Sequence, residues 1–221
     1  MGIYKIFLVK LSMGKEINWE KIISNYGSPT IAKRDLLLPY FSNLDYSEPI
    51  LDLGCGNGLF AKILSKKFEV IGLDIHENSF DEFKYIKVDA EKIPLADCSV
   101  GDVLLINVFS CIGDLEKIIR VLKEVKRVKK ENSKVYVVDT SQEFAKEEIS
   151  SEIFSSKIIG EQRIKIKTKK VDGSFIEFED NVILYGDFRE CVSKAHLKVV
   201  ETKDFVHPLV GKQIYRLWIL Q

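Results

Sequence analysis

The chain has 221 residues, of which 46% are hydrophobic and 30% are charged, with 33 basic and 33 acidic side chains. This composition excludes disordered and fibrous proteins, and the length fits one α/β domain. The balanced charge provides no global field that would gather nucleic acid, so a nucleic-acid site would have to be a local patch.

The cysteines and the N-terminal residues indicate the compartment. The four cysteines form no C-x-x-C pair and have no histidine at ligand spacing, which argues against structural zinc and a disulfide framework. Residues 1–12 hold a short apolar run broken by Lys5 and Lys10, too short to span a bilayer and without a cleavage site. The sequence therefore predicts a cytoplasmic protein without a membrane segment.

The first two thirds of the chain alternate between strand and helix patterns. Apolar residues at helical spacing predict a helix over 17–26, and Ser28-Pro29 is typical of the start of a second helix. Continuous apolar runs predict strands at 49–54, 69–74, 83–89, 101–109 and 133–140, with amphipathic helices at 58–68 and 114–130. Such alternation predicts a parallel sheet covered on both faces.

The last third departs from this alternation. Residues 142–159 have a weakly helical pattern, and 163–185 resemble a hairpin that turns at Asp172-Gly173, so we interpret 142–185 as an insertion. A helix is predicted over 186–197. The two closing strands, 198–205 and 213–220, are too close together for a helical crossover and must pair antiparallel.

A glycine-rich turn follows the first predicted strand. Gly54, Gly56 and Gly58 stand at alternate positions, whereas a dinucleotide-binding turn requires G-x-G-x-x-G and here has Leu59 as the next residue. A P-loop is excluded because no Gly-Lys-Ser/Thr follows. A nicotinamide-dependent oxidoreductase therefore stays only as a weaker alternative.

Three carboxylates at the ends of successive strands indicate the ligand. Asp52, before the glycines, would repel a pyrophosphate and attract an ammonium group. Asp74 ends the second strand, where a carboxylate can accept hydrogen bonds from both ribose hydroxyls. Asp89 ends the third strand and could accept from an adenine amino group, with the Ala90 N–H donating to the ring. An ammonium group, a ribose and an adenine together describe S-adenosylmethionine.

With these residues in place, the chain resembles the class I S-adenosylmethionine-dependent methyltransferases, and is similar to the small-molecule members of the ubiquinone/menaquinone-biosynthesis kind. The resemblance rests on "ILDLGCGNG", "VIGLD" and "VDAEKIPLADCSVGDVLLIN" and spans roughly 17–141 and 186–221. It implies a Rossmann-like, mostly parallel seven-stranded sheet of order 3-2-1-4-5-7-6 with an antiparallel last strand. It also implies one domain over 1–221, with an extension and lid helices at 1–44 and an insertion at 142–185 that shapes the substrate site.

The same resemblance implies transfer of a methyl group from S-adenosylmethionine to a small-molecule acceptor by in-line displacement, leaving S-adenosylhomocysteine, with no metal and no obligatory base. The cofactor-binding residues that it implies are Tyr26, Asp52, Gly54, Cys55, Gly56, Gly58, Asp74, Ile75, Asp89, Ala90 and Asn107. Phe109 and His207 are expected on the substrate side, because the fourth strand and the turn after the sixth should both approach the acceptor.

Other acceptors and a non-catalytic role remain open at this point. The basic side chains of "RIKIKTKK" (163–170) could grip phosphates, although we favour a solvated edge strand protected by lysines. The fourth strand lacks the Asn/Asp-Pro-Pro-aromatic tetrapeptide of many base-methylating relatives, which disfavours DNA amino methylation. The alternatives are an RNA or protein methyltransferase and a methyltransferase-like binding module. The sequence indicates neither the atom that is methylated nor the oligomeric state.

Overall fold

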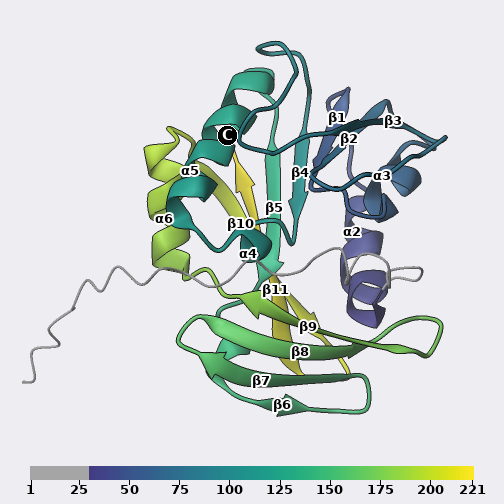
Figure 1. The fold of residues 1–221 in the computed structure, drawn as a ribbon, viewed down its shortest axis with the longest axis vertical. Helices are drawn as coiled ribbons and strands as arrows, with labels where there is room; N and C mark the ends of the chain where they lie inside the picture. The colour runs from purple at the N-terminus through teal and green to yellow at the C-terminus, as the bar shows by residue number, and fades with distance from the viewer. Residues whose placement is uncertain (1–29) are drawn as a thin grey trace, which may run out of the picture.

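The computed structural model describes residues 30–221 as two sheets with helices around the larger one (Figure 1). The larger sheet has seven strands in the order β3-β2-β1-β4-β5-β11-β10. Its strands are β1 (Ile50–Leu53), β2 (Val70–Asp74), β3 (Lys84–Lys87), β4 (Val103–Ile106), β5 (Val135–Thr140), β10 (Val199–His207) and β11 (Lys212–Leu220). The predicted order 3-2-1-4-5-7-6 is therefore confirmed.

Strand directions also follow the prediction. β1 pairs in parallel with β2 and β4, β2 with β3, and β4 with β5. β11 runs antiparallel to both β5 and β10, which makes it the reversed strand of the sheet. Every residue of β1, β4 and β5 is buried, as expected for strands covered on both faces. The carboxyl ends of the parallel strands consequently meet at one edge, where ligands of such sheets bind.

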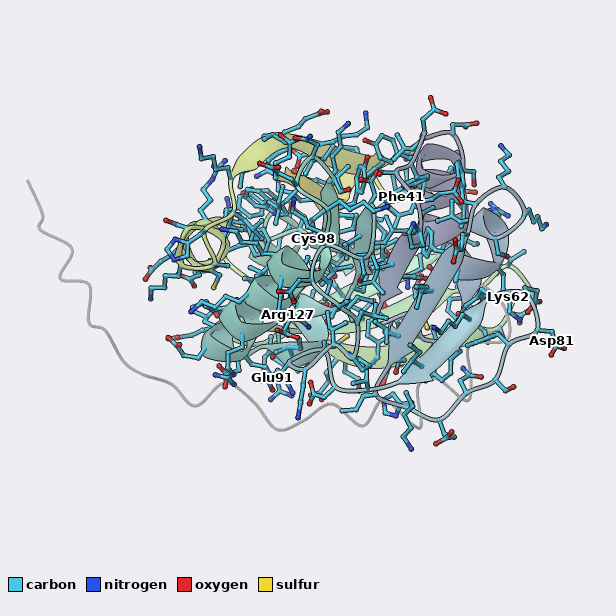
Figure 2. The ribbon with its side chains drawn as sticks, turned by 90° about the horizontal axis from the view of Figure 1, so that it is seen from above. Phe41, Lys62, Asp81, Glu91, Cys98 and Arg127 are labelled. Atoms are coloured by element: carbon cyan, nitrogen blue, oxygen red, sulfur yellow. The ribbon has the colours of Figure 1, made fainter. Side chains whose placement is uncertain are left out.

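Helices cover both faces of this sheet. On one face lie α5 (Leu115–Val128) and α6 (Tyr185–Lys194), and on the other α2 (Leu38–Phe41) and α3 (Leu59–Leu64). Seen from above, Arg127 on α5 and Phe41 on α2 mark these two sides (Figure 2). The five residues before α2, η1 (Lys33–Leu37), are π-helical. A four-residue helix, α4 (Phe109–Ile112), follows β4.

The insertion forms a second, antiparallel sheet of order β6-β7-β8-β9, drawn below the larger sheet in Figure 1. It contains η2 (Phe144–Lys146), a short 3₁₀ helix, and β6 (Ile149–Ser150), β7 (Phe154–Gly160), β8 (Arg163–Lys169) and β9 (Phe175–Asn181). The predicted hairpin with its turn at Asp172-Gly173 is confirmed, and Gly173 has a positive φ of 87°.

Two expectations for the insertion were wrong. The weak helical pattern over 142–159 yields only the three residues of η2, because β7 gains a ladder of hydrogen bonds with β8. β8, which carries the basic side chains of 163–170, lies between β7 and β9 and is therefore not an edge strand. Its opposite face, with Ile164 and Ile166, is buried and packs towards the larger sheet.

Buried hydrogen bonds fix the insertion to the larger sheet. Asn181 Nδ2 donates to the Ser110 carbonyl at 2.7 Å, and Thr140 Oγ1 donates to Asp180 Oδ2 at 2.7 Å. At its base the chain leaves and returns at adjacent points, where the hydroxyl oxygens of Ser141 and Tyr185 lie 2.7 Å apart. β9 therefore reaches the carboxyl ends of the parallel strands.

The predicted helix over 17–26, with Tyr26, and the N-cap at Ser28 lie outside the described residues. The helix expected after Ser28-Pro29 is represented by η1 and α2. Within residues 30–221 the helices are all too short or too polar to cross a membrane.

Candidate active site

The glycine turn connects β1 to α3 at the carboxyl edge of the sheet. Gly54, Gly56 and Gly58 have φ values of 75°, 56° and 75°, a left-handed conformation that glycine adopts without steric cost. A Cβ at Gly54 would lie 2.6 Å from Val108, whereas a Cβ at Gly56 would meet nothing within 4 Å. The first glycine thus permits close packing, and the middle one faces open space in which a ligand can lie.

Asp52 lies in β1, directly before this turn. Its side chain is 2% exposed, and Oδ2 has no hydrogen-bond partner among the described residues. The pKa of Asp52 is raised to about 7, chiefly by burial and also by the charge of Asp74; a hydrogen bond from the Ala61 backbone and the charge of Lys33 oppose the rise. A buried carboxylate oxygen without a donor is costly, so the arrangement favours a ligand that supplies a positively charged donor.

Asp74 and Ile75 end β2 beside the turn. Asp74 Oδ2 accepts a hydrogen bond from the Gly56 N–H at 2.8 Å, and Oδ1 accepts one from the His76 N–H at 3.0 Å. Each carboxylate oxygen keeps a second lone pair, so both ribose hydroxyls can still donate to Asp74. The Ile75 side chain is 54% exposed and offers an apolar surface that an adenine ring would cover.

Asp89 and Ala90 follow β3 at the same edge. The Asp89 side chain is 44% exposed, and its Oδ2 lies 3.4 Å from Lys117 Nζ on α5. Lys117 also pairs with Glu91 Oε1 at 3.2 Å. The Asp89 carboxylate is therefore accessible, but a ligand amino group would share it with a lysine.

The two cysteines near the site pack against protein. Cys55 is buried, with Sγ close to where a Cβ on Gly72 would lie, and Cys111 Sγ donates to the Asn107 carbonyl at 2.6 Å. Burial raises the pKa of both thiols. Neither thiol is suited to act as a nucleophile, because the reactive thiolate is disfavoured.

Asn107 follows β4 and has a φ of 59°, a conformation that asparagine tolerates better than most residues. Its backbone N–H donates to the Val138 carbonyl at 2.7 Å, which fixes the position of the side chain. Its Oδ1 is buried and has no hydrogen-bond partner in the described part of the chain. Asn107 thus directs a second free acceptor oxygen towards this edge of the sheet.

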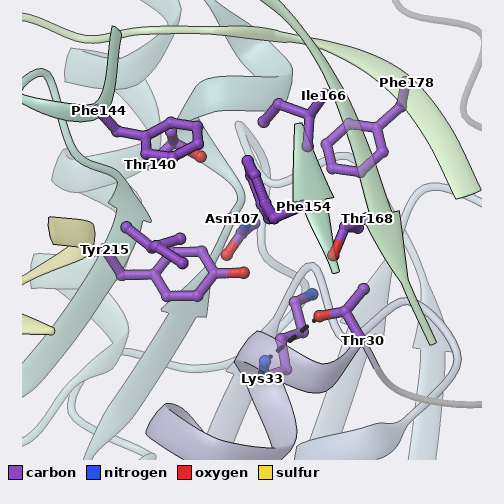
Figure 3. Close-up of a pocket in the computed structure, with 11 residues that line it drawn as sticks. Thr30, Lys33, Asn107, Thr140, Phe144, Phe154, Ile166, Thr168, Phe178 and Tyr215 are labelled. Atoms are coloured by element: carbon purple, nitrogen blue, oxygen red, sulfur yellow. Dashed lines mark hydrogen bonds between the residues drawn. The ribbon is translucent and has the colours of Figure 1, made fainter. Parts of the chain in front are cut away.

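A cavity of about 20 Å³ lies between this edge and the insertion sheet (Figure 3). The side chains of Phe144, Phe154, Phe178 and Ile166 form an apolar side, whereas Asn107, Tyr215, Lys33, Thr30 and Thr168 carry polar atoms. Thr140 and Ile214 complete the lining. The cavity is about the size of one water molecule, but its lining, apolar with a few convergent polar groups, resembles that of a small-molecule site.

The two residues expected on the substrate side are not brought to this cavity. Phe109 is fully buried, and its ring packs 5.8 Å from Phe188 in the core beneath α6. His207 is 1% exposed and has its Nε2 3.6 Å from Asp35 Oδ2 on η1. β10 does end at the ligand edge as expected, but its last side chain packs under η1 rather than facing the cavity.

The sequence did not predict Lys33 and Thr140, which line the cavity, or Asp180, which accepts a hydrogen bond from Thr140. Lys33 begins η1. Burial lowers the pKa of Lys33, and its electrostatic interactions with neighbouring acidic groups oppose that shift; these groups are Cys111, Asp180, Asp52 and Asp139. Thr140 and Asp180 come from β5 and β9. A lysine on an amphipathic helix and an aspartate ending a hairpin strand both resemble solvated surface residues, so the sequence contained no clear signal for either.

Comparison with known proteins agrees with this geometry. Residues 51–137 match the family model described as a methyltransferase domain. An S-adenosylmethionine-dependent methyltransferase from Clostridium acetobutylicum is 14% identical, with a TM-score of 0.62 over 92% of this chain and 95% of that one. A second from Aquifex aeolicus is 18% identical, with a TM-score of 0.59 over 90% and 97%. No curated protein matches the sequence.

A third similar structure carries ligands. The Burkholderia thailandensis 1,6-didemethyltoxoflavin-N1-methyltransferase, with bound 1,6-didemethyltoxoflavin and S-adenosylhomocysteine, is 11% identical, with a TM-score of 0.52 over 77% of this chain and 69% of that one. At these identities the structural likenesses establish the fold. The strand order and the glycine turn thus define a class I methyltransferase fold.

Residues 51–137 thus match a methyltransferase domain, and the fold of the chain is that of class I S-adenosylmethionine-dependent methyltransferases. The domain match and the S-adenosylmethionine-dependent methyltransferases among the similar structures support S-adenosylmethionine as the methyl donor. The residues present fit that group: Asp52 has a free buried oxygen for an ammonium, Gly56 faces open space, and Ile75 leaves an apolar surface uncovered.

Proposed function

We propose that the acceptor is a small molecule that binds in the cavity beneath the insertion sheet. The observation that carries this proposal is the composition of the cavity wall, in which aromatic residues of the insertion face Asn107 at the carboxyl end of β4. The cavity has room for about one water-sized group, so binding of an acceptor requires its side chains to move aside. The name of the Burkholderia enzyme likewise describes a small acceptor.

Residues around the glycine turn would hold the methyl donor. Asp52 would accept from the ammonium group, and Lys33, which is within electrostatic reach of Asp52, would pair with the carboxylate of the same amino-acid part. Asp74 would accept from the ribose hydroxyls. Asp89 and the Ala90 N–H would contact the adenine, beside Ile75. Gly54, Cys55 and Gly58 shape the turn, and Asn107 separates it from the acceptor.

The bound donor supplies a methyl group already activated on a sulfonium. The protein therefore contributes chiefly by alignment, which can lower the barrier by about 7–11 kcal/mol when the reacting atoms are held in line. The walls of the cavity are largely buried, and the ends of β4 and β5 would fix the position at which the acceptor atom lies. A metal is not required for this chemistry.

A macromolecular acceptor is less well supported. On the outer face of the insertion sheet Arg163 pairs with Glu179, and Lys165 pairs with Glu177. These ion pairs neutralise two of the four basic side chains at alternate positions of β8, which would otherwise be available to bind phosphates. The quinone-biosynthesis subtype, the cytoplasmic location and the single-domain organisation over 1–221 stay predictions.

Titration calorimetry of S-adenosylmethionine, S-adenosylhomocysteine and NAD against the wild type tests the donor site first. We expect micromolar binding of the two adenosyl ligands and none of NAD, and at least a tenfold loss in Asp74→Ala, roughly the loss of one charge-assisted hydrogen bond. Asp81→Ala, at an exposed carboxylate beyond β2, is the control and should bind normally.

The acceptor part of the proposal has its own test. Wild-type protein with the methyl donor is incubated with a library of small aromatic and heteroaromatic compounds, and in parallel with total RNA and a peptide library. Methylated products are detected by mass spectrometry. Methylation of RNA or peptides but of no small compound would contradict the proposal, and donor binding without any methylated product would favour the non-catalytic binding module.

A further inference from the structure

A network of charged side chains lies beyond the carboxyl end of β3, where the adenine of the methyl donor is expected. Asp89 follows β3, and the N–H of the preceding residue, Val88, donates to the Asp74 carbonyl at 2.8 Å. The carboxylate proposed to contact the base therefore lies next to the carboxylate proposed to contact the ribose.

Lys117 on α5 contacts the Asp89 carboxylate through a partly exposed ion pair. Its Nζ lies 3.4 Å from Asp89 Oδ2 and 3.2 Å from Glu91 Oε1, and Arg120 pairs with the other oxygen of Glu91. The side chains of Asp89 and Lys117 are 44% and 29% exposed. Ion pairs with this much exposure are weak, so a ligand can compete with the contact between Lys117 and Asp89.

Each member of this pair keeps unused hydrogen-bonding capacity. Asp89 Oδ1 accepts the Glu91 N–H at 3.1 Å, and among the described residues Oδ2 accepts from Lys117 alone. A carboxylate oxygen has two lone pairs, and the Lys117 ammonium has three hydrogens for two carboxylates. A lone pair of Asp89 and a hydrogen of Lys117 are thus available side by side.

An adjacent hydrogen-bond acceptor and donor match the edges of two kinds of purine. Adenine presents an amino group, which can donate to Asp89, beside a ring nitrogen, which can accept from Lys117. A 6-oxopurine presents the reverse order, with a carbonyl oxygen that can accept from Lys117 and a ring N–H that can donate to Asp89. A carboxylate alone would reject that oxygen, because two acceptors would face each other.

We propose that Lys117 is a specificity-determining residue of the donor site, which lets this site bind ligands whose base is a 6-oxopurine as well as those whose base is adenine. The inference rests on the proposed function, from which it takes the contact between Asp89 and the base. The Ala90 N–H suits the accepting ring nitrogen of adenine only, so a modest preference for adenine is retained.

Calorimetry with two ligands that differ at one position of the base tests the proposal. S-adenosylhomocysteine, with a 6-amino group, and S-inosylhomocysteine, with a 6-oxo group, are each titrated into the full-length wild type and Lys117→Met. We expect the wild type to bind the two ligands within about tenfold of each other, and Lys117→Met to weaken the inosyl ligand about tenfold more than the adenosyl ligand. Lys123→Met, at an exposed lysine on the same helix, is the control and should keep the wild-type ratio.

Two results would overturn the role of Lys117. The first is a wild type that binds the adenosyl ligand more than about tenfold more tightly than the inosyl ligand, a measurement that does not depend on the folding of any variant. The second is a Lys117→Met variant in which both affinities fall by the same factor, as expected of a purely structural lysine. Failure of S-adenosylhomocysteine itself to bind the wild type would overturn the proposed donor site as well, whereas failure of the inosyl ligand alone contradicts only the role of Lys117.

Discussion

The Gly56 N–H donates a hydrogen bond of 2.8 Å to Asp74 Oδ2, and this bond connects the glycine turn to the end of β2. The two parts of the donor site are thus held in register by the side chain that is expected to bind the ribose. Structural and binding roles of Asp74 can be separated by the substitutions below.

Asp74→Asn should lower the free energy of unfolding by about 1–3 kcal/mol. Both carboxylate oxygens accept backbone N–H groups, from Gly56 and His76, and an amide places its own NH₂ against one of these donors. Urea denaturation measures the change, with the exposed Asp81→Asn as the control. Equal stability of the two variants would show that the carboxylate contributes nothing to the turn.

Gly58→Ala should destabilise the protein more than Gly56→Ala. Both glycines have positive φ, so each substitution costs about 1–2 kcal/mol of backbone strain. At Gly58 the new methyl would also lie 2.9 Å from Phe80 and 3.0 Å from Phe83, whereas at Gly56 it meets open space. Urea midpoints of the two variants check this difference. Gly56→Ala should instead weaken S-adenosylhomocysteine binding, because its methyl occupies the space assigned to the ligand.

Lys33→Met should weaken binding of S-adenosylhomocysteine about tenfold or more while leaving 5′-methylthioadenosine unaffected. The second ligand lacks the amino-acid group whose carboxylate Lys33 is proposed to pair with. Calorimetry with both ligands provides the measurement, and Lys62→Met, on the exposed side of α3, is the control. A loss of affinity for both ligands would assign Lys33 a structural role.

Affinity for S-adenosylhomocysteine should rise with pH through about 7. Burial raises the pKa of Asp52 to about 7, and only the ionised carboxylate attracts the ligand ammonium. Asp52→Asn should bind more weakly above that pH and show little change across it. A titration series at several pH values checks both statements, and a parallel pH dependence in the two proteins would contradict the role of Asp52.

Stability should fall as pH rises from roughly 4 to 7, and Asp139→Asn should reduce this fall. Burial raises the pKa of Asp139 to about 7 from an ordinary 3.8, so the folded protein holds a proton that the unfolded chain has released. The stabilisation is complete below the unfolded pKa and is lost as pH rises through the folded one. Asparagine keeps an oxygen for the Ser110 N–H and cannot ionise. Urea denaturation across this range should show a smaller total loss of stability in Asp139→Asn than in the wild type.

The sequence predicted the methyltransferase core well because its signals are local. Gly54, Gly56 and Gly58 are dictated by backbone conformation, and the all-buried strands leave continuous apolar runs. The strand order followed from the resemblance to a family, and the structure agrees with it.

The acceptor side was predicted poorly because its residues meet only in three dimensions. Lys33, Thr140 and Asp180 come from three separate elements, and each looks like an ordinary polar residue in its own segment. His207 ends β10 as expected, whereas Phe109 begins α4 rather than ending β4, and both side chains pack against helices that the local pattern does not specify. Residues 142–159 were misassigned because pairing with β8 outweighs local helix propensity.

The insertion departs from the core after Ser141 and returns at Tyr185, and these two residues are in hydrogen-bond contact. The Tyr185 N–H also donates to Gln142 Oε1 at 2.7 Å, which closes the base of the excursion. A segment with joined ends can be lengthened, shortened or exchanged without altering the register of β5 or the start of α6. If the insertion binds the acceptor as proposed, the acceptor site can be changed by exchanging residues 142–184 while the donor site at the glycine turn is left intact.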